Sequence, residues 1–138
     1  MIITCEHASN DVKYTKLLPH EEELSRSHDY FDIGAADLAN QLSEEMKCVA
    51  VLANYCKLFC DPSKPLVDSQ IIRYHYKQLD EEGKLQMVSF NNQGFRLYER
   101  LESYYLEYHK ILQEVMEYVE PELVINVHSH DADQVNSP

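Results

Sequence analysis

Short apolar segments alternate with amphipathic segments along this chain, and this alternation restricts the fold more than any other feature. Residues 1–5 form a β-rich run, and residues 48–53 form a continuous apolar run that predicts a buried strand. Residues 123–127 predict another strand near the end of the chain. Residues 57–60 also fit a strand, which would stop at the two prolines of residues 61–65.

Two segments between these strands have helical spacing. From Asp32, apolar residues recur at steps of three or four, which predicts a helix with Asp32 as its N-cap and an end near Met46. A long helix is expected from Gln93 to Val119, and Pro121 ends it. Its apolar stripe consists of Leu97, Leu101, Tyr104, Tyr108, Ile111, Val115 and Val119.

The other segments are expected to connect these elements. Residues 8–31 are polar and irregular and predict a long loop that includes a helical turn, whereas residues 66–91 give only a weak signal. The order of elements is then β-α-β-β-α-β. It predicts an α/β fold with helices packed on the faces of the sheet, and 138 residues suit one domain.

The composition excludes several classes of function. A formal net charge of −12 argues against binding to nucleic acid or to an anionic membrane. The chain has only three glycines and contains no Gly-rich phosphate-binding motif. No apolar stretch approaches the roughly 20 residues that cross a bilayer, and the first apolar run is too short for a signal peptide. We therefore expect a cytoplasmic protein.

The four cysteines, at positions 5, 48, 56 and 60, are expected to be reduced thiols in that compartment. Cys56 and Cys60 are four residues apart, so they could share a metal. No second cysteine pair accompanies them, and their spacing is looser than that of a zinc knuckle.

Two of the expected strands run into histidine at their carboxyl ends. The first leads to Glu6 and His7, and the last leads to His128-Ser-His130. Ligands of open α/β sheets bind beyond the carboxyl ends of the strands, so His7 and His128 could face one crevice. Imidazole is the commonest protein ligand of zinc, and a carboxylate can complete a hydrolytic site. The alternative is that each histidine only caps its strand through a backbone carbonyl.

Residues 28–35 supply candidate carboxylates. Asp32 is either an N-cap and nothing more, or a ligand whose carboxylate leans toward the strand ends. His28 and Glu6 compete with Asp32 for the same role, so the residues alone leave the third ligand open.

Four motifs in this chain resemble those of N-formylglutamate amidohydrolases, and they occur in the family's order. Residues 4–10 (TCEHASN) and residues 28–35 (HDYFDIGA) look like the family's opening signature. Residues 53–65 are similar to a segment that usually reads Ser-Arg-Leu and then an Asp-Pro-Asn-Arg-Pro turn. Residues 127–129 match the family's strand that ends in His-Ser.

The resemblance implies a phosphorylase/hydrolase-like, three-layer α/β/α fold with a mixed, mostly parallel sheet. It implies a metal-dependent amidohydrolase whose substrate is a small N-acyl amino acid, such as N-formyl-L-glutamate, which yields formate and glutamate. The implied metal is Zn²⁺ or another divalent ion, held by His7, Asp32 and His128, and Glu6 is the candidate catalytic residue.

A dicarboxylate needs cations to hold it, and Lys57, Lys64 and Arg96 are the candidates. The alternative is that each is an ordinary solvated charge on the surface. Asp61 joins them as a substrate-site residue that orients Lys64, or else it only opens the turn at Pro62. Each lysine stands where the family usually has arginine. Because lysine lacks the planar fork of arginine, a different substrate preference or a loss of activity could follow.

Family members generally continue beyond the last strand, so we expect residues 1–138 to be a single domain that lacks its C-terminal part. The alternative to the enzyme is a truncated or degenerate, non-catalytic member that binds a small acidic ligand or a protein partner. A third hypothesis makes the tyrosine-rich helix of residues 93–119 an interaction surface.

Overall fold

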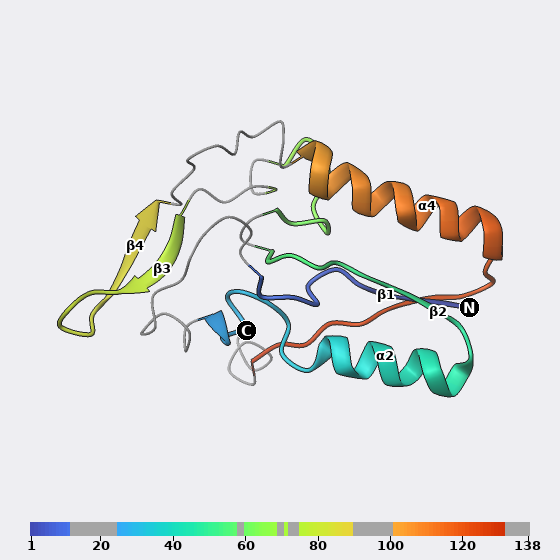
Figure 1. Ribbon diagram of the computed structural model, residues 1–138, viewed down its shortest axis with the longest axis horizontal. Helices are drawn as coiled ribbons and strands as arrows, with labels where there is room; N and C mark the ends of the chain where they lie inside the picture. Colours follow the sequence, from blue (N-terminus) through green and yellow to red (C-terminus); the bar gives the residue numbers. More distant parts are fainter. Residues whose placement is uncertain (12–24, 58–59, 69–70, 72–74, 90–100, 132–138) are drawn as a thin grey trace, which may run out of the picture.

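The computed structural model describes most of the chain, namely residues 1–11, 25–57, 60–68, 71, 75–89 and 101–131. Three strands form a parallel sheet in the order β2-β1-β5: β1 (Ile2–Cys5), β2 (Val49–Leu52) and β5 (Val124–Asn126). All three run away from the N-terminus marked in Figure 1. The first and last strands of the chain are therefore neighbours, and their carboxyl ends meet at one edge of the sheet.

Helices cover both sides of this sheet. Helix α2 (Ala35–Met46) lies on one side, and helix α4 (Glu107–Val119) lies on the other (Figure 1). A π-helical segment, η2 (Leu101–Leu106), leads directly into α4. This arrangement confirms the predicted three-layer α/β/α fold. The three-stranded sheet β2-β1-β5 is parallel throughout.

The strand side chains divide between two cores because successive side chains point to opposite faces. The core on the α2 side consists of Ile3, Cys5, Ala35, Ala39 and Val127. The other core contains Val51, Tyr55, Cys56, Cys60, Tyr105 and Tyr108, among others. Both faces of the central strand are thus buried, which is why β1 reads as a continuous apolar run.

A hairpin extends from the layered part of the molecule (Figure 1). Strands β3 (His75–Leu79) and β4 (Leu85–Ser89) pair antiparallel as a separate sheet. Its turn is closed by Asp80, whose carboxylate accepts hydrogen bonds from the backbone of Lys84 at 2.7 Å and of Glu82 at 3.0 Å. Residues 66–91 carried only a weak signal in the sequence, so this hairpin was not expected.

The predicted strand at residues 57–60 is not found at its two described positions. Residue 57 belongs to a turn, and Cys60 is in no strand and donates its amide to the carbonyl of Cys56 at 3.2 Å. Residues 58–59 lie outside the described part.

The prediction that Asp32 caps a helix is wrong. Helix α2 begins at Ala35, and its N-cap is Gly34 in the left-handed region with φ of 77°. The side chain of Asp32 is buried and points elsewhere.

The second long helix is confirmed over η2 and α4, and residues 93–100 of the prediction lie outside the described part. Its apolar stripe differs by one position, because Ile111 is exposed and Leu112 packs against the core. Around the helix axis, Leu112, four residues after Tyr108, points about 40° away from the core-facing direction of Tyr108. Ile111, three residues after Tyr108, points about 60° away and so faces the core less well. Tyr105 and Tyr108 are buried, so they do not form an exposed interaction surface.

Candidate metal centre

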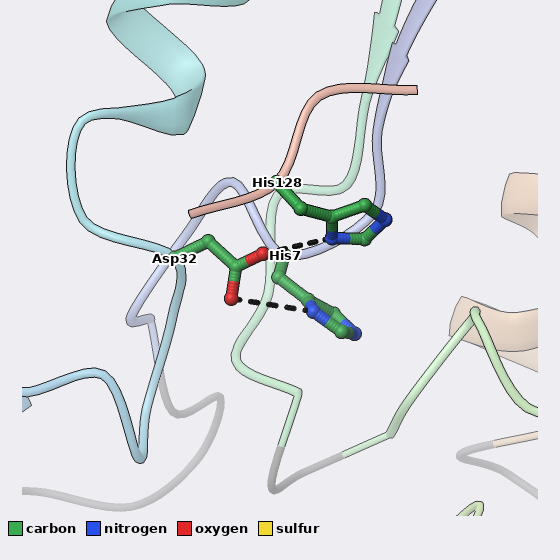
Figure 2. Close-up of side chains that lie close together, drawn as sticks. All are labelled: His7, Asp32 and His128. Carbon is green, nitrogen blue, oxygen red and sulfur yellow. Dashed lines mark hydrogen bonds and ion pairs between the residues drawn. The ribbon is translucent and has the colours of Figure 1, made fainter. Parts of the chain in front are cut away.

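Three side chains from distant segments converge at the carboxyl edge of the parallel sheet. His7 follows β1, His128 follows β5, and Asp32 precedes α2. Each offers one potential ligand atom, and these atoms all lie within 4.8 Å of one another. Figure 2 shows both imidazole rings turning a nitrogen toward the carboxylate of Asp32. The pairing of β1 with β5 creates this meeting point, since it places the residues after both strands side by side.

The carboxylate of Asp32 is the centre of the group. Its Oδ2 accepts a hydrogen bond from Nδ1 of His128 at 2.8 Å, and its Oδ1 lies 3.4 Å from Nδ1 of His7. The ammonium of Lys57 donates to Oδ1 at 3.2 Å. Burial opposes the ionisation of Asp32, but the hydrogen bond from His128 and the charges of His7 and Lys57 outweigh it and lower the pKa of Asp32 below 3.8. The site therefore holds an ionised carboxylate.

The outer nitrogens of both rings face other carboxylates. Nε2 of His7 lies 2.8 Å from Oδ1 of Asp61, which is buried. Nε2 of His128 lies 3.7 Å from Oε2 of Glu6. Glu6 is itself held by Asn126, whose side-chain amide donates to Oε2 at 3.1 Å. Each imidazole thus presents Nδ1 to Asp32 and Nε2 to a second carboxylate, an arrangement typical of metal-bound histidines.

The donor set and its spacing fit a divalent metal. Two imidazole nitrogens and one carboxylate are ligands of hydrolytic zinc sites. Ligand atoms about 2.0–2.1 Å from one tetrahedral zinc lie about 3.3–3.4 Å apart. The separation of 3.4 Å between His7 Nδ1 and Asp32 Oδ1 matches this value. The contact of 2.8 Å between His128 and Asp32 is a hydrogen bond, and a shared cation would require it to open slightly.

A pocket of about 350 Å³ opens over these residues. Its lining is polar and consists of His7, His28, Asp29, Asp32, Lys57, His128, Ser129 and His130. The imidazole of His28 is paired with Asp131 through Nε2, at 3.2 Å from Oδ1. The volume lies near the lower end of the range for small-molecule sites, so the pocket suits a compact polar ligand.

The sequence model of N-formylglutamate amidohydrolases matches residues 1–137 of this chain. The chain belongs to the N-formylglutamate amidohydrolase family. The fold is also similar to the crystal structure of gene product Atu2144 from Agrobacterium tumefaciens, with a TM-score of 0.68 at 22% identity. That match covers 94% of this chain and 51% of the solved chain, so the chain spans about half the length of that neighbour. No curated protein matches the sequence.

The family resemblance inferred from the four motifs is therefore confirmed, and the structure brings three of the expected site residues into one group. Lys57, which was expected to bind substrate, also lines the pocket. Glu6 lies beside His128 but does not line the pocket. Asp61 lies behind His7 and does not orient Lys64 through its side chain, because its carboxylate binds His7 and Ser63. Arg96 lies outside the described residues.

Lys64 does not line the pocket of this family member, and its backbone carbonyl accepts from the hydroxyl of Tyr105 at 2.7 Å. His28, which the sequence offered as an alternative ligand to Asp32, lines the pocket but is not in the ligand group. The lining residues that were not expected in the site are Asp29, Ser129 and His130. Each lies within three positions of Asp32 or His128, and that closeness in sequence was the only signal for them.

The suggested metal site at Cys56 and Cys60 is not found among the described residues, where the only group of three potential ligands is the one at Asp32. Cys56 instead donates its thiol hydrogen to the carbonyl of Tyr30 at 3.1 Å. All four cysteines lie in the described part and are thiols, as expected. No described helix combines the length and apolar character needed to cross a bilayer.

Proposed function

We propose that this chain carries the metal-binding site of a hydrolase that cleaves the linear amide bond of an N-acyl amino acid, with N-formyl-L-glutamate as the first candidate. One observation carries the proposal: both imidazoles turn Nδ1 toward Asp32 while their outer nitrogens face Asp61 and Glu6. Two histidines that only capped their strands would have no reason to share this orientation.

In this proposal His7, Asp32 and His128 are the ligands of Zn²⁺ or another divalent ion. A bound divalent cation would supply Lewis acidity to the acyl oxygen and lower the pKa of water to about 7. For Nδ1 of His128 to serve as a ligand, it must give up the hydrogen that it donates to Asp32. The hydrogen of the neutral ring would then sit on Nε2, which faces Oε2 of Glu6 across 3.7 Å. We therefore assign Glu6 a positioning role toward His128 in place of the catalytic role expected from the sequence.

A bound divalent cation would make the charge of the pocket suit an anionic substrate. With its imidazoles neutral, the lining carries the carboxylates of Asp29 and Asp32 and the ammonium of Lys57. A bound divalent cation would change this excess of one negative charge into an excess of one positive charge. Lys57, released from Asp32 by that cation, would then be available for a substrate carboxylate as a point charge. For the second carboxylate of glutamate, Arg96 stays a prediction, because Lys64 does not line the pocket and Arg96 lies outside the described residues.

A second candidate is a non-catalytic family member that binds a small acidic ligand. It is favoured by the position of Glu6, whose carboxylate is engaged by Asn126 and His128 outside the pocket lining. Under both hypotheses the ligand is a small molecule. We place the protein in the cytoplasm, because four thiols without a disulfide suit a reducing compartment.

Metal content tests the proposal. Protein purified without chelators should contain about one divalent ion per chain by plasma mass spectrometry. The ion should be lost from His7→Ala and from His128→Ala. His130→Ala is the matched control, since His130 lines the same pocket but is not in the ligand group, and it should keep the ion. Wild-type protein that stays metal-free after incubation with Zn²⁺, Mn²⁺ and Co²⁺ would contradict the proposal.

Turnover separates the two candidates. Metal-loaded protein is incubated with N-formyl-L-glutamate and a panel of other N-acyl amino acids, and the released acid is measured. Release that disappears in His128→Ala supports the hydrolase. Stoichiometric metal and ligand binding without release would instead favour the non-catalytic member.

A further inference from the structure

The contact between His7 and Asp61 lies behind the metal-binding group. Asp61 is only 2% exposed, and its Oδ1 is 2.8 Å from Nε2 of His7. The same Oδ1 also accepts hydrogen bonds from the backbone amide and the hydroxyl of Ser63. An oxygen that accepts from these two donors is an acceptor for His7 as well, so Nε2 of His7 is the donor.

This donor role fixes the tautomer of His7. A neutral imidazole carries one N–H, and placing that hydrogen on Nε2 leaves Nδ1 with a free lone pair. Nδ1 is the nitrogen that faces Oδ1 of Asp32 at 3.4 Å. Two atoms with lone pairs face each other there, and a cation between them would satisfy both. Asp61 therefore prepares His7 as a ligand without touching the pocket.

Hydrogen bonds within the turn of residues 61–65 hold the carboxylate of Asp61 in place. The amide and hydroxyl of Ser63 both donate to Oδ1 of Asp61, at 3.0 and 2.6 Å. Two further hydrogen bonds connect this turn to η2 and α4. The hydroxyl of Tyr105 in η2 donates to the carbonyl of Lys64 at 2.7 Å, and Nε2 of His109 in α4 donates to the carbonyl of Pro62 at 2.9 Å.

We propose that Asp61 is a positioning residue that acts through His7, and that η2 and α4 brace it by holding the turn of residues 61–65. The inference rests on the proposed function, because it assigns Asp61 to the metal site and removes it from substrate binding. Carboxylates that orient metal-bound histidines typically contribute 10- to 100-fold to metal affinity. A carboxylate that only opened the turn at Pro62 would contribute nothing to metal affinity.

The tautomer of His7 is measured first, without any metal. Long-range ¹⁵N–¹H spectra of histidine-labelled protein, recorded in EDTA at pH 9 where ordinary imidazole is neutral, report which nitrogen carries the hydrogen. His7→Gln assigns the signal. We expect the Nε2–H form in the wild type and a shift toward the Nδ1–H form in Asp61→Asn, whose amide can donate to Nε2. A wild-type His7 protonated on Nδ1, alone or together with Nε2, overturns the inference.

Zinc affinity is measured next by competition with a chromophoric chelator. Asp61→Asn should bind zinc about 10- to 100-fold more weakly than wild type. Asp131→Asn is the matched control, because it removes an equal charge near the pocket from an exposed carboxylate that contacts His28. Its affinity should change by less than about fivefold. Equal losses in the two variants would reduce the effect to general electrostatics and overturn the inference.

The two proposals fail in different ways. If no metal binds but His7 shows the tautomer that depends on Asp61, the positioning of His7 stands and the hydrolase proposal fails. If zinc binds equally well to wild type and Asp61→Asn, the hydrolase proposal stands and the inference fails. Should Asp61→Asn not fold by circular dichroism, Ser63→Ala and Tyr105→Phe replace it, since both leave the carboxylate in place. Each should weaken zinc binding by about two- to fivefold, and unchanged affinity in both contradicts the brace.

Discussion

Asp32 and His128 are 96 positions apart in the chain, yet Oδ2 of Asp32 lies 2.8 Å from Nδ1 of His128. The residue after His128 strengthens the same junction, because the hydroxyl of Ser129 donates to the carbonyl of Ile33 at 2.7 Å. On the other side, the amide of Asp32 donates to the carbonyl of His7 at 2.9 Å. These hydrogen bonds connect the segment that leads into α2 with the ends of both β1 and β5. The metal-binding group lies at this junction.

Replacing Asp32 by asparagine should abolish tight metal binding. The side-chain amide of asparagine is neutral and is a weaker metal ligand than a carboxylate. The change also removes the negative charge that Lys57, His7 and His128 share. We expect zinc affinity to fall by more than about 100-fold, beyond the effect of changing a residue that only orients a ligand. Calorimetric titration with zinc measures it. Asp37→Asn makes the same chemical change on the exposed side of α2 and should bind like wild type.

Acid should destabilise the metal-free protein through Asp32 and Asp61. Both carboxyls are buried, but hydrogen bonds and nearby positive charge hold the pKa of each below 3.8 in the folded state. The unfolded chain then binds more protons near pH 4, so this stabilisation is complete above pH 4 and is lost as the pH falls toward the folded pKa. The urea midpoint, measured in EDTA from pH 5 to pH 2, should fall less steeply in Asp61→Asn. Parallel curves for the two proteins would refute the prediction.

Only one thiol should react quickly in the folded protein. Cys5, Cys56 and Cys60 are fully buried, whereas Cys48 is partly exposed. Burial, together with the charge of Asp32, raises the pKa of Cys5 to about 11, so it forms little thiolate at pH 8. Ellman's reagent should therefore detect one fast thiol in native protein and all four after denaturation. The fast phase should disappear in Cys48→Ser; its persistence there would mean that the strand ends open readily.

The central strand should dominate the stability of the sheet. Ile3 is fully buried and lies between Ala50 and Ile125 on the neighbouring strands. Ile3→Ala should lower the free energy of unfolding by about 2–5 kcal/mol, because it removes buried methyl groups and leaves a cavity. Ile111→Ala makes the same change at a side chain that is 43% exposed and should cost less than about 1 kcal/mol. Urea unfolding of both variants tests the difference.

Local sequence pattern was sufficient for most secondary structure. The apolar runs at residues 1–5, 48–53 and 123–127 became β1, β2 and β5, and helical spacing located α2 and α4. At the described end of the strand expected over residues 57–60, Cys60 enters the core from a segment that is not a strand, as does the neighbouring Cys56. A short apolar run reports burial, and burial alone does not distinguish a strand from a buried turn.

The histidines at the strand ends could be identified from sequence because the carboxyl edge of a parallel sheet is a property of chain direction. The sequence by itself therefore determined the family, the layered fold and the pairing of His7 with His128 as candidates. Only the tertiary structure decided that Asp32 is a buried partner of both histidines and not a helix cap, and that Asp61 supports His7 from behind. The physical reason is that a carboxylate's role depends on which groups surround it in space, and those groups come from strands and turns far apart in the chain.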